Sequence, residues 1–229
     1  MISSILSFVN STFAAYTSFR MSSVDPAPFV WVGNHRALDF VNTSIAVEGV
    51  PRDLLTGLDD LVGWLVRSGA LDAAVGRAAL ARWGGRRRGE SVVEAARTLR
   101  TALRRLADAW AAGKPAPRAT LARVNELLAR GAGTSRIVPA ADGEGFTVER
   151  GLRLEQPEDL LVPVAEAAAD LLCRADPGRV RRCAHPRCVL YFLDGTKNGT
   201  RRWCDMRTCG NRTNAAAYYR RRRAGPAAD

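Results

Sequence analysis

The sequence predicts a mainly α-helical protein of the α+β class, in which a helical domain with a small β-hairpin precedes a compact, cysteine-rich module that ends in a basic helix. Apolar residues recur every three or four positions through most of the chain, and Gly and Pro separate these runs. Four of the five cysteines fall within residues 183–209. With 229 residues, the chain is long enough for one sizeable domain and one small one.

The first 28 residues are expected to form a leader outside the folded domains. Residues 1–19 carry no charge, but they lack the basic start of a secretory signal, and seven Ser and Thr residues interrupt them. They also fall short of a membrane span. Met21 precedes a polar, Pro-containing stretch, so we expect either a disordered leader or a true translation start at Met21. Without an export signal, we expect a cytoplasmic protein that does not bind membranes.

Hydrophobic periodicity predicts a series of helices between residues 29 and 175. The first carries apolar residues at Leu58, Leu61 and Leu65 and stops near a glycine. The predicted helices cover residues 56–69, residues 72–83, the segment from Ser91 to just before Gly113, the segment from Pro117 to just before Gly131, and the segment from Glu158 to about Arg174.

The third of these helices is predicted to start at Ser91. Ser91 and Glu94 form a Ser-x-x-Glu capping box, in which two side chains satisfy free backbone N–H groups. The preceding residues 84–89 read Gly-Gly-Arg-Arg-Arg-Gly and are interpreted as a solvated loop between helices. A contribution of this loop to anion binding is the alternative.

A β-hairpin is predicted in residues 136–153, where the helical period stops. The pair Asp142-Gly143 lies between two β-type runs and favours a tight turn. The predicted domain boundary is Asp176-Pro177-Gly178, because proline ends the preceding helix and the charge of the sequence changes there.

The positive charge is concentrated at the C-terminal end. The chain has a formal net charge of +11, and residues 179–223 contain 13 Lys and Arg against only Asp194 and Asp205. The remaining residues carry 21 basic and 21 acidic side chains, so the body is neutral. A local excess of this size attracts polyanions such as nucleic acids.

Two Cys-x4-Cys pairs predict a metal site. Cys183 and Cys188 form the first pair, Cys204 and Cys209 form the second, and fifteen residues separate the pairs. Two pairs on opposed turns can surround one tetrahedral ion, and zinc with four thiolates is the usual occupant. We therefore predict one structural Zn²⁺ at these cysteines. Catalytic zinc is disfavoured, because such sites keep an open position.

Other uses of the cysteines stay open at this stage. Two disulfides would need an oxidising compartment, and an iron–sulfur cluster would use the same four sulfurs. His185 lies inside the first pair and can replace a sulfur, although a turn residue with a solvated ring is the preferred interpretation. The fifth cysteine, Cys173, is predicted to be a buried thiol on the apolar face of the preceding helix.

The residues between and after the pairs predict a treble-clef or ribbon-like module. Residues 189–193 form a β-type run, Asp194-Gly195 a turn, and residues 197–203 a return toward the second pair, which together predict a zinc-pinned hairpin with a basic rim. Its aromatic residues are expected to form a small core rather than to stack on bases. A helix is expected to begin near Cys209, and residues 220–223 are either a frayed tail or phosphate contacts.

These residues resemble a known family. The run RRWCDMRTCGNR, both Cys-x4-Cys pairs and the run Asp194-x-x-Lys197-Asn198 resemble the CGNR zinc finger, a C-terminal module of bacterial stress-induced transcription regulators. The family also carries an N-terminal ABATE domain with a Leu-Asp-Phe-Val-Asn-Thr motif, which GNHRALDFVNT at residues 33–43 resembles. The resemblance divides the chain into an ABATE-like domain at 29–175, a zinc finger at 179–223 and a tail at 224–229. Thr213-Asn214 departs from the family pattern, which often has a small residue and Lys there.

The resemblance implies zinc and DNA binding in the finger and a sensory role for the body. Asp39, Asn42 and Thr43 of the body motif are interpreted as capping residues, with a small polar pocket for an unknown small-molecule effector as the alternative. The body contains no recognisable set of base, nucleophile and metal ligands, so we predict that the protein is not an enzyme.

The leading hypothesis is therefore a DNA-binding transcription regulator, whose body senses an effector or forms a homodimer. RNA or an acidic protein surface is the alternative partner, and an enzyme activity hidden in the body is a third hypothesis. Arginines would contact phosphates, and Asn211 or Asn214 would read bases. The residues predicted to contact nucleic acid are Lys197, Arg201, Arg202, Asn211, Arg212, Asn214, Arg220 and Arg221.

Overall fold

The computed structural model describes residues 29–47, 49–131, 134–139, 146–151 and 154–223. The predictions for the leader, for the Asp142-Gly143 turn and for the tail from residue 224 lie outside the described residues. No helix in the described part of the chain combines the length and hydropathy needed to cross a membrane.

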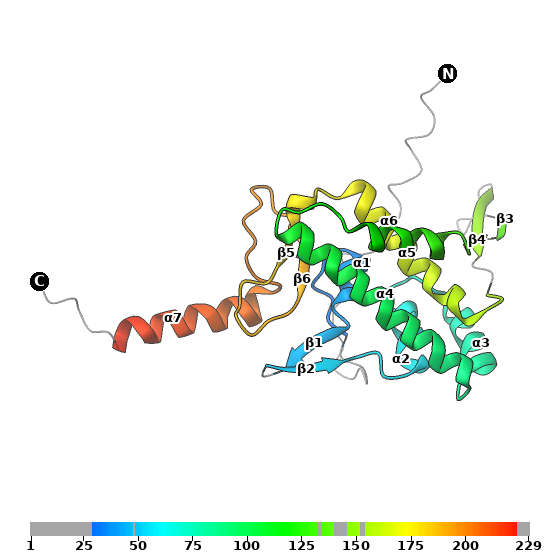
Figure 1. Ribbon diagram of the computed structural model, residues 1–229, viewed down its shortest axis with the longest axis horizontal. Coiled ribbons are helices and arrows are strands. Elements are labelled where there is room, and N and C mark those ends of the chain that lie inside the picture. The colour runs from blue at the N-terminus through cyan, green and yellow to red at the C-terminus, as the bar shows by residue number, and fades with distance from the viewer. Residues whose placement is uncertain (1–28, 48, 132–133, 140–145, 152–153, 224–229) are drawn as a thin grey trace, which may run out of the picture.

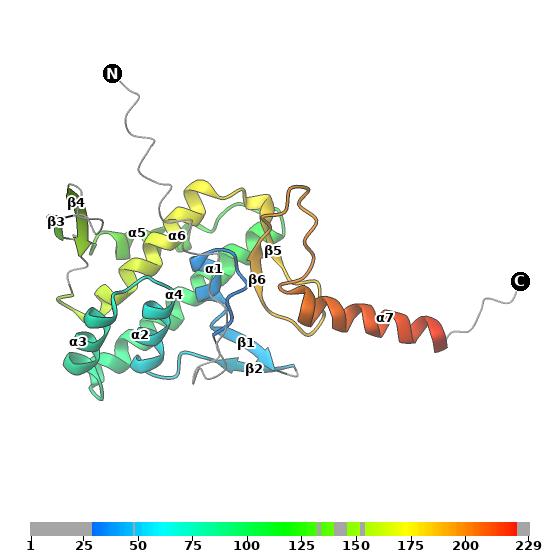
Figure 2. The same ribbon diagram turned by 180° about the vertical axis from the view of Figure 1, so that it is seen from behind.

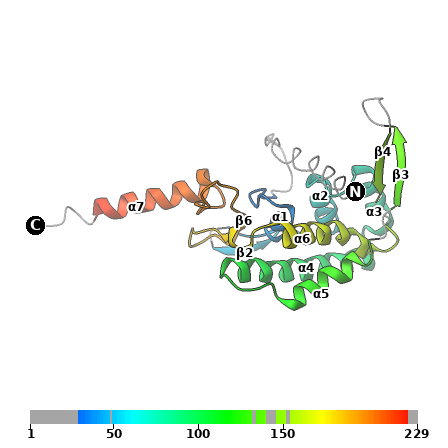
Figure 3. The ribbon, with the colours of Figure 1, turned by 90° about the horizontal axis from the view of Figure 1, so that it is seen from above.

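The body is a helical domain built around one long central helix, α4. Helices α1, α2, α3 and α5 all contact α4, and α5 runs alongside it (Figure 3). The apolar faces of these helices form one continuous core, as the hydrophobic periodicity predicts. The helices of the body are α1 (Arg36–Val41), α2 (Leu58–Arg67), α3 (Ala73–Trp83), α4 (Arg87–Ala111), α5 (Arg118–Leu128) and α6 (Val162–Arg174).

Side-chain caps explain where α2 and α3 begin. The Asp60 carboxylate accepts hydrogen bonds from the backbone N–H groups of Thr56 and Gly57 at the start of α2. Asp72 caps α3 by accepting from the N–H groups of Ala74 and Val75. Both helices confirm the sequence prediction.

The start of α4 differs from the prediction. The helix begins at Arg87, so Ser91 lies inside it and the predicted capping box is wrong. Gly85, with a φ of 63°, makes the turn after α3. Residues 86–90 contain no proline, so the helix can begin before Ser91. The Cα of Gly89 packs so closely on α3 that an added Cβ would lie 2.5 Å from the Trp83 carbonyl oxygen. The predicted basic loop is therefore shortened to residues 84–86.

Two further details of the helices need correction. The predicted helix from Glu158 begins as a 3₁₀ turn, Pro157–Leu161, and becomes α-helical only at α6. Cys173 is exposed rather than buried. It follows the buried Leu171 by two positions, which is about 200° around a helix, so the thiol lies on the opposite face.

Two antiparallel hairpins extend from the body. Strands β3 (Thr134–Pro139) and β4 (Phe146–Gly151) form the hairpin that the sequence predicts. Strands β1 (Ser44–Val47) and β2 (Val50–Asp53) form one that the sequence analysis missed. They are short, none of their residues is fully buried, and they show no alternation of buried and exposed residues, so the usual signal of a half-buried strand is absent.

The C-terminal module begins with a third hairpin. Strand β5 (Val180–Arg182) pairs antiparallel with β6 (Tyr191–Leu193), so the loop between these strands carries the first cysteine pair. The predicted pairing of the run at 189–193 with the return through residues 197–203 is therefore wrong. A helical turn (Met206–Gly210) then leads into α7 (Asn211–Arg223), which extends away from the body (Figures 1 and 2).

The module packs directly on the body. Val180 and Tyr191 belong to the same apolar core as the helices, and β5 contacts α4. A second small core surrounds the metal site and contains Leu190 and Phe192, with Val32 and Ile45 of the body packed against it. The hairpin and the metal site are thus joined to the body, whereas α7 is not part of either core.

Candidate metal centre

The four paired cysteines converge on one point. The Sγ atoms of Cys183, Cys188, Cys204 and Cys209 all lie within 4.8 Å of one another. The Cys204 sulfur lies 3.7 Å from that of Cys188 and 3.6 Å from that of Cys209. A tetrahedral zinc ion with Zn–S bonds of about 2.3 Å requires sulfurs about 3.8 Å apart. The four sulfurs are therefore positioned to bind one zinc ion, as predicted.

The ionisation of the thiols supports a cation at this point. Side-chain hydrogen bonds from Cys188 and Cys204 lower the pKa of Cys183 to about 2. The hydrogen bond to Cys183 raises the pKa of Cys188 to about 12, and hydrogen bonds to Cys183 and Cys188 raise the pKa of Cys204. One thiolate therefore keeps its neighbours protonated when no cation balances the charge. A divalent ion removes this conflict, because it stabilises all four thiolates at once.

Turns at both pairs orient the sulfurs. In the first pair, the imidazole Nδ1 of His185 accepts from the Arg187 N–H, and the Cys188 N–H donates to the His185 carbonyl. His185 thus acts in the turn and is not among the four grouped ligands. In the second pair, the Asp205 carboxylate accepts from the Thr208 N–H and caps the helical turn that carries Cys209. The Cys204 N–H also donates to the Cys183 sulfur at 3.4 Å.

Asp194 anchors the loop that separates the hairpin from the second pair. Its buried carboxylate accepts from the Thr196 N–H and hydroxyl and from the Arg201 N–H, and it lies 3.5 Å from Arg181. Burial acts to raise its pKa, but these hydrogen bonds and the positive charge outweigh burial and hold the pKa below the usual Asp range. The carboxylate therefore stays charged and fixes the loop in a non-strand conformation.

Arg201 is directed inward. Its guanidinium donates to the carbonyl oxygens of Trp203, Cys204 and Val32, and it lies 4.2 Å from the centre of the Phe192 ring. Three of its N–H groups are thus bonded within the protein. Its neighbour Arg202 is exposed and lies over the Trp203 ring, at 5.1 Å from its centre.

Asn42 joins the body to the metal module. Its side-chain amide donates to the Tyr191 carbonyl at 2.9 Å, and its side-chain oxygen accepts from the Tyr191 N–H at 2.9 Å. The amide thereby replaces a neighbouring strand for this residue of β6. Asn42 is fully buried, so both hydrogen bonds are shielded from water.

The other residues of the body motif support this junction. The backbone of Gly33 accepts from the Leu193 N–H at its carbonyl and donates its own N–H to the Asp39 carboxylate. A Cβ on Gly33 would lie 2.8 Å from Asp39, so only glycine fits there. Asn34, with a left-handed φ of 53°, donates to the Leu193 carbonyl. The Thr43 hydroxyl accepts from Arg100, which also pairs with Asp53.

Arg104 and Asp108 of α4 complete the junction. The Arg104 guanidinium donates to the Val189 carbonyl of the module and to the Val41 and Ser44 carbonyls of the body. The Tyr191 hydroxyl donates to Asp108. Burial, followed by this hydrogen bond to a carboxylate, raises the pKa of Tyr191 to about 12. Sequence analysis missed all of these contacts, because their partners lie 60 or more residues away along the chain and most of them are backbone atoms.

The predicted nucleic-acid residues lie in two places. Lys197 and Arg202 are exposed on the loop before the second cysteine pair. Asn211, Arg212 and Asn214 are exposed on the first turns of α7. Arg220 is exposed near its end, and Arg221 belongs to the same helix. The structure thus places Arg201 apart from the exposed residues of this set, because its guanidinium is turned into the module.

Two family models match the chain. The ABATE model, described as "Putative stress-induced transcription regulator", matches residues 34–175, which is more than half of the sequence. The CGNR zinc finger model matches residues 179–222. The chain therefore belongs to the ABATE family and carries a CGNR zinc finger, as its motifs predict. No curated protein matches the chain. Together the two matches indicate a zinc-binding regulator.

Proposed function

We propose that this protein is a cytoplasmic, zinc-dependent transcription regulator whose C-terminal module binds duplex DNA. The observation that carries the proposal is the exposure of α7, which extends from the metal centre away from the body (Figures 1 and 3). Asn211, Arg212, Asn214 and Arg220 make no side-chain hydrogen bond or ion pair with any residue that the structure describes.

The composition of α7 supports an external, anionic partner. In its described residues, only Thr213 and Ala217 are half-buried, so the helix has no apolar face that packs on a core. Its last turn carries four consecutive arginines, residues 220–223, whose charges repel one another. A polyanion relieves this repulsion and supplies the contacts that the helix lacks in the free protein.

The size of α7 fits the major groove. Its 13 residues span about 20 Å at 1.5 Å per residue, and the groove is about 12 Å wide. In this proposal, Asn211 and Asn214 read base edges, because an amide can pair with adenine through two hydrogen bonds. Arg212, Arg220 and Arg221 contact phosphates, and Lys197 and Arg202 add phosphate contacts from the neighbouring loop.

The body supplies regulation in this proposal, through an effector or through a second copy of the chain, and we assign it no catalytic reaction. Single-stranded RNA is the second candidate partner for the module. The observation that favours it is a pair of adjacent tyrosines on α7, Tyr218 and Tyr219, which are 50% and 63% exposed. Aromatic side chains with this exposure can stack on unpaired bases.

The test is to sequence genomic fragments bound by the zinc-loaded full chain, with Cys204→Ser/Cys209→Ser as the control. We expect discrete duplex sites that the control loses. Anisotropy with one such duplex then gives the salt dependence. Neutralisation of about five phosphates predicts a slope of log K against log salt near −4 to −5. A slope near zero, or equal recovery by the control, contradicts the proposal, and stronger competition by single-stranded RNA favours the second candidate.

A further inference from the structure

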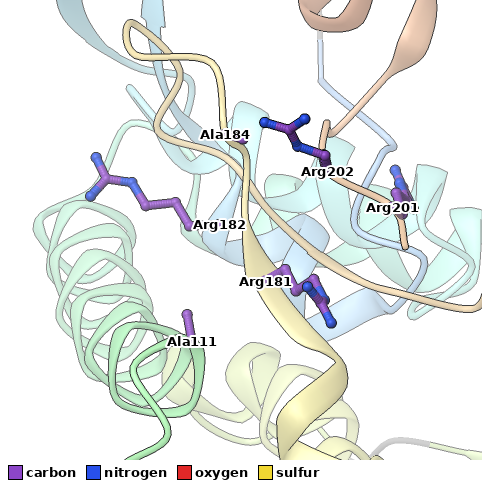
Figure 4. Close-up of a pocket in the computed structure, with 6 residues that line it drawn as sticks. All are labelled: Ala111, Arg181, Arg182, Ala184, Arg201 and Arg202. Carbon is purple, nitrogen blue, oxygen red and sulfur yellow. The ribbon is translucent and has the colours of Figure 1, made fainter. Parts of the chain in front are cut away.

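A cavity of about 330 Å³, widely open to solvent, lies at the junction between the body and the metal module. Its size corresponds to roughly ten water molecules. Ala111 from the end of α4 lines one side, strand β5 contributes two arginines, and the loop before Cys204 contributes two more (Figure 4). The lining residues are Ala111, Arg181, Arg182, Ala184, Arg201 and Arg202.

The charge of this cavity is unusual, because four of its six lining residues are arginines and none is acidic. Arg182 and Arg202 are exposed, and neither guanidinium makes a hydrogen bond or an ion pair with the described residues. Figure 4 shows Arg202 extending toward Ala184, and Arg182 extending from β5 on the side of α4. Both side chains can turn onto a ligand, but Arg202 first has to leave the Trp203 ring, whose centre lies 5.1 Å from its guanidinium carbon.

The other two arginines are held in place. Arg201 is fixed by the carbonyl oxygens described above. Arg181 lies beside Asp194, but its buried Nε makes no hydrogen bond, since the nearest carboxylate oxygen is 3.5 Å away. The Asp194 carboxylate forms an ion pair with this guanidinium and keeps it in place. The cavity is thus lined by two arginines whose guanidinium groups are held by the protein and by two, Arg182 and Arg202, that are exposed.

We propose that this cavity binds a phosphate group. Guanidinium groups donate pairs of parallel N–H bonds that match phosphate oxygens, and several guanidinium groups around one cavity favour an anion with more than one negative charge. The phosphate belongs either to a small phosphorylated ligand or to the backbone of bound nucleic acid. Only in the second case does the inference rest on the proposed function. All four arginines belong to the metal module, on β5 and on the loop before Cys204, so the bound phosphate would hold these two segments of the module together.

The test uses the zinc-loaded full chain and inorganic pyrophosphate as the probe, measured by titration calorimetry. Zinc content is measured after the titration, because pyrophosphate also chelates metal. The variant is Arg182→Gln/Arg202→Gln, which removes the two exposed guanidinium groups. The matched control is Arg77→Gln/Arg88→Gln, which removes the same charge from exposed arginines on α3 and α4, at the far end from α7 (Figure 1).

We expect pyrophosphate to bind the wild-type protein and the control with equal affinity, and to bind the variant at least about tenfold more weakly, as loss of charge-assisted hydrogen bonds predicts. No binding to the wild-type protein, or equal binding to the variant, overturns the inference. Duplex DNA distinguishes the sources of the phosphate. If pyrophosphate displaces the duplex and the variant also loses duplex affinity, the phosphate comes from DNA. If pyrophosphate binds without displacing the duplex, it comes from a small ligand.

The two proposals fail separately in this experiment. A protein that binds pyrophosphate through Arg182 and Arg202 but binds no duplex contradicts the proposed function and leaves the phosphate site intact. A protein that binds duplex through α7, with no pyrophosphate site, overturns the inference alone.

Discussion

The junction and α7 are both rich in arginine, but they use this residue in opposite ways. At the junction, Arg104 and Arg201 donate to six carbonyl oxygens. Four of these oxygens belong to other segments (Val41, Ser44, Val189 and Val32) and two, Trp203 and Cys204, to the loop that carries Arg201, so these donors hold chain segments together. On α7, Arg212 and Arg220 are exposed and bond to nothing in the described chain. Net charge alone does not separate these roles. The positions of the donors show that one region maintains the structure and the other is available to a partner.

Removal of the metal is expected to have the largest effect on the stability of the junction. Cys204→Ser, or zinc extraction with a chelator, removes about 10 kcal/mol of binding energy that stabilises the folded module. Because Val180 and Tyr191 belong to the core of the body, we expect a lower melting temperature for the body as well. Calorimetry of the zinc-loaded and zinc-free protein measures this. A body transition that does not change on zinc removal would show that the junction carries little energy.

Asn42→Ala is expected to have the next largest effect. It removes both side-chain hydrogen bonds to the Tyr191 backbone and leaves two buried polar groups without partners, which costs about 3 kcal/mol. The control is Asn198→Ala, because Asn198 is exposed and has no side-chain hydrogen bond to the described residues. Urea unfolding of the two variants gives the difference. Equal free energies of unfolding for the two variants would show that the Asn42 hydrogen bonds do not stabilise the junction.

Arg201 and Arg202 are adjacent in sequence and offer a direct comparison of the two uses. Arg201→Gln is expected to cost about 2 kcal/mol, because several carbonyl oxygens lose a charged donor. Arg202→Gln is expected to change the free energy of unfolding by less than about 0.5 kcal/mol. Urea unfolding of both variants measures the two changes in the free energy of unfolding. If Arg202→Gln is the more destabilising change, the assignment of the inward and outward arginine is reversed.

Sequence patterns predict those parts of the molecule that depend on local spacing. The helices follow from the 3.6-residue period, and the metal ligands follow from two short cysteine pairs, since each pair is held by its own turn. Cys173 shows the limit of this approach. It lies in a helix that the sequence predicts, but the prediction placed its side chain on the buried face, whereas the structure places it on the exposed face.

The junction could not be predicted in this way, because its contacts join residues far apart. Asn42 and Tyr191 are separated by 149 residues, and the amide bonds backbone atoms that carry no sequence signal. Strand β5 was missed for a related reason. Its three residues are too few to show an alternation of buried and exposed positions. Strand β6 pairs with Val180–Arg182, and not with the segment after Asp194, because of where these segments lie in the folded protein. The buried charge of Asp194 then keeps that segment out of the sheet.

The smallest effect on stability is expected on α7, and this prediction tests the outward region. Arg212→Gln removes an exposed side chain that contacts nothing described, so the free energy of unfolding should change by less than about 0.5 kcal/mol. The same change removes one proposed phosphate contact and should make the salt slope for duplex DNA shallower by about 0.9. Arg77→Gln on α3 is the matched control and should change neither quantity, since α3 lies at the opposite end of the molecule (Figure 2). A variant that keeps its stability but has a shallower salt slope identifies α7 as a surface for an anionic partner. A variant that unfolds more easily while its salt slope is unchanged would instead give α7 a structural role, and the contrast with the junction would no longer hold.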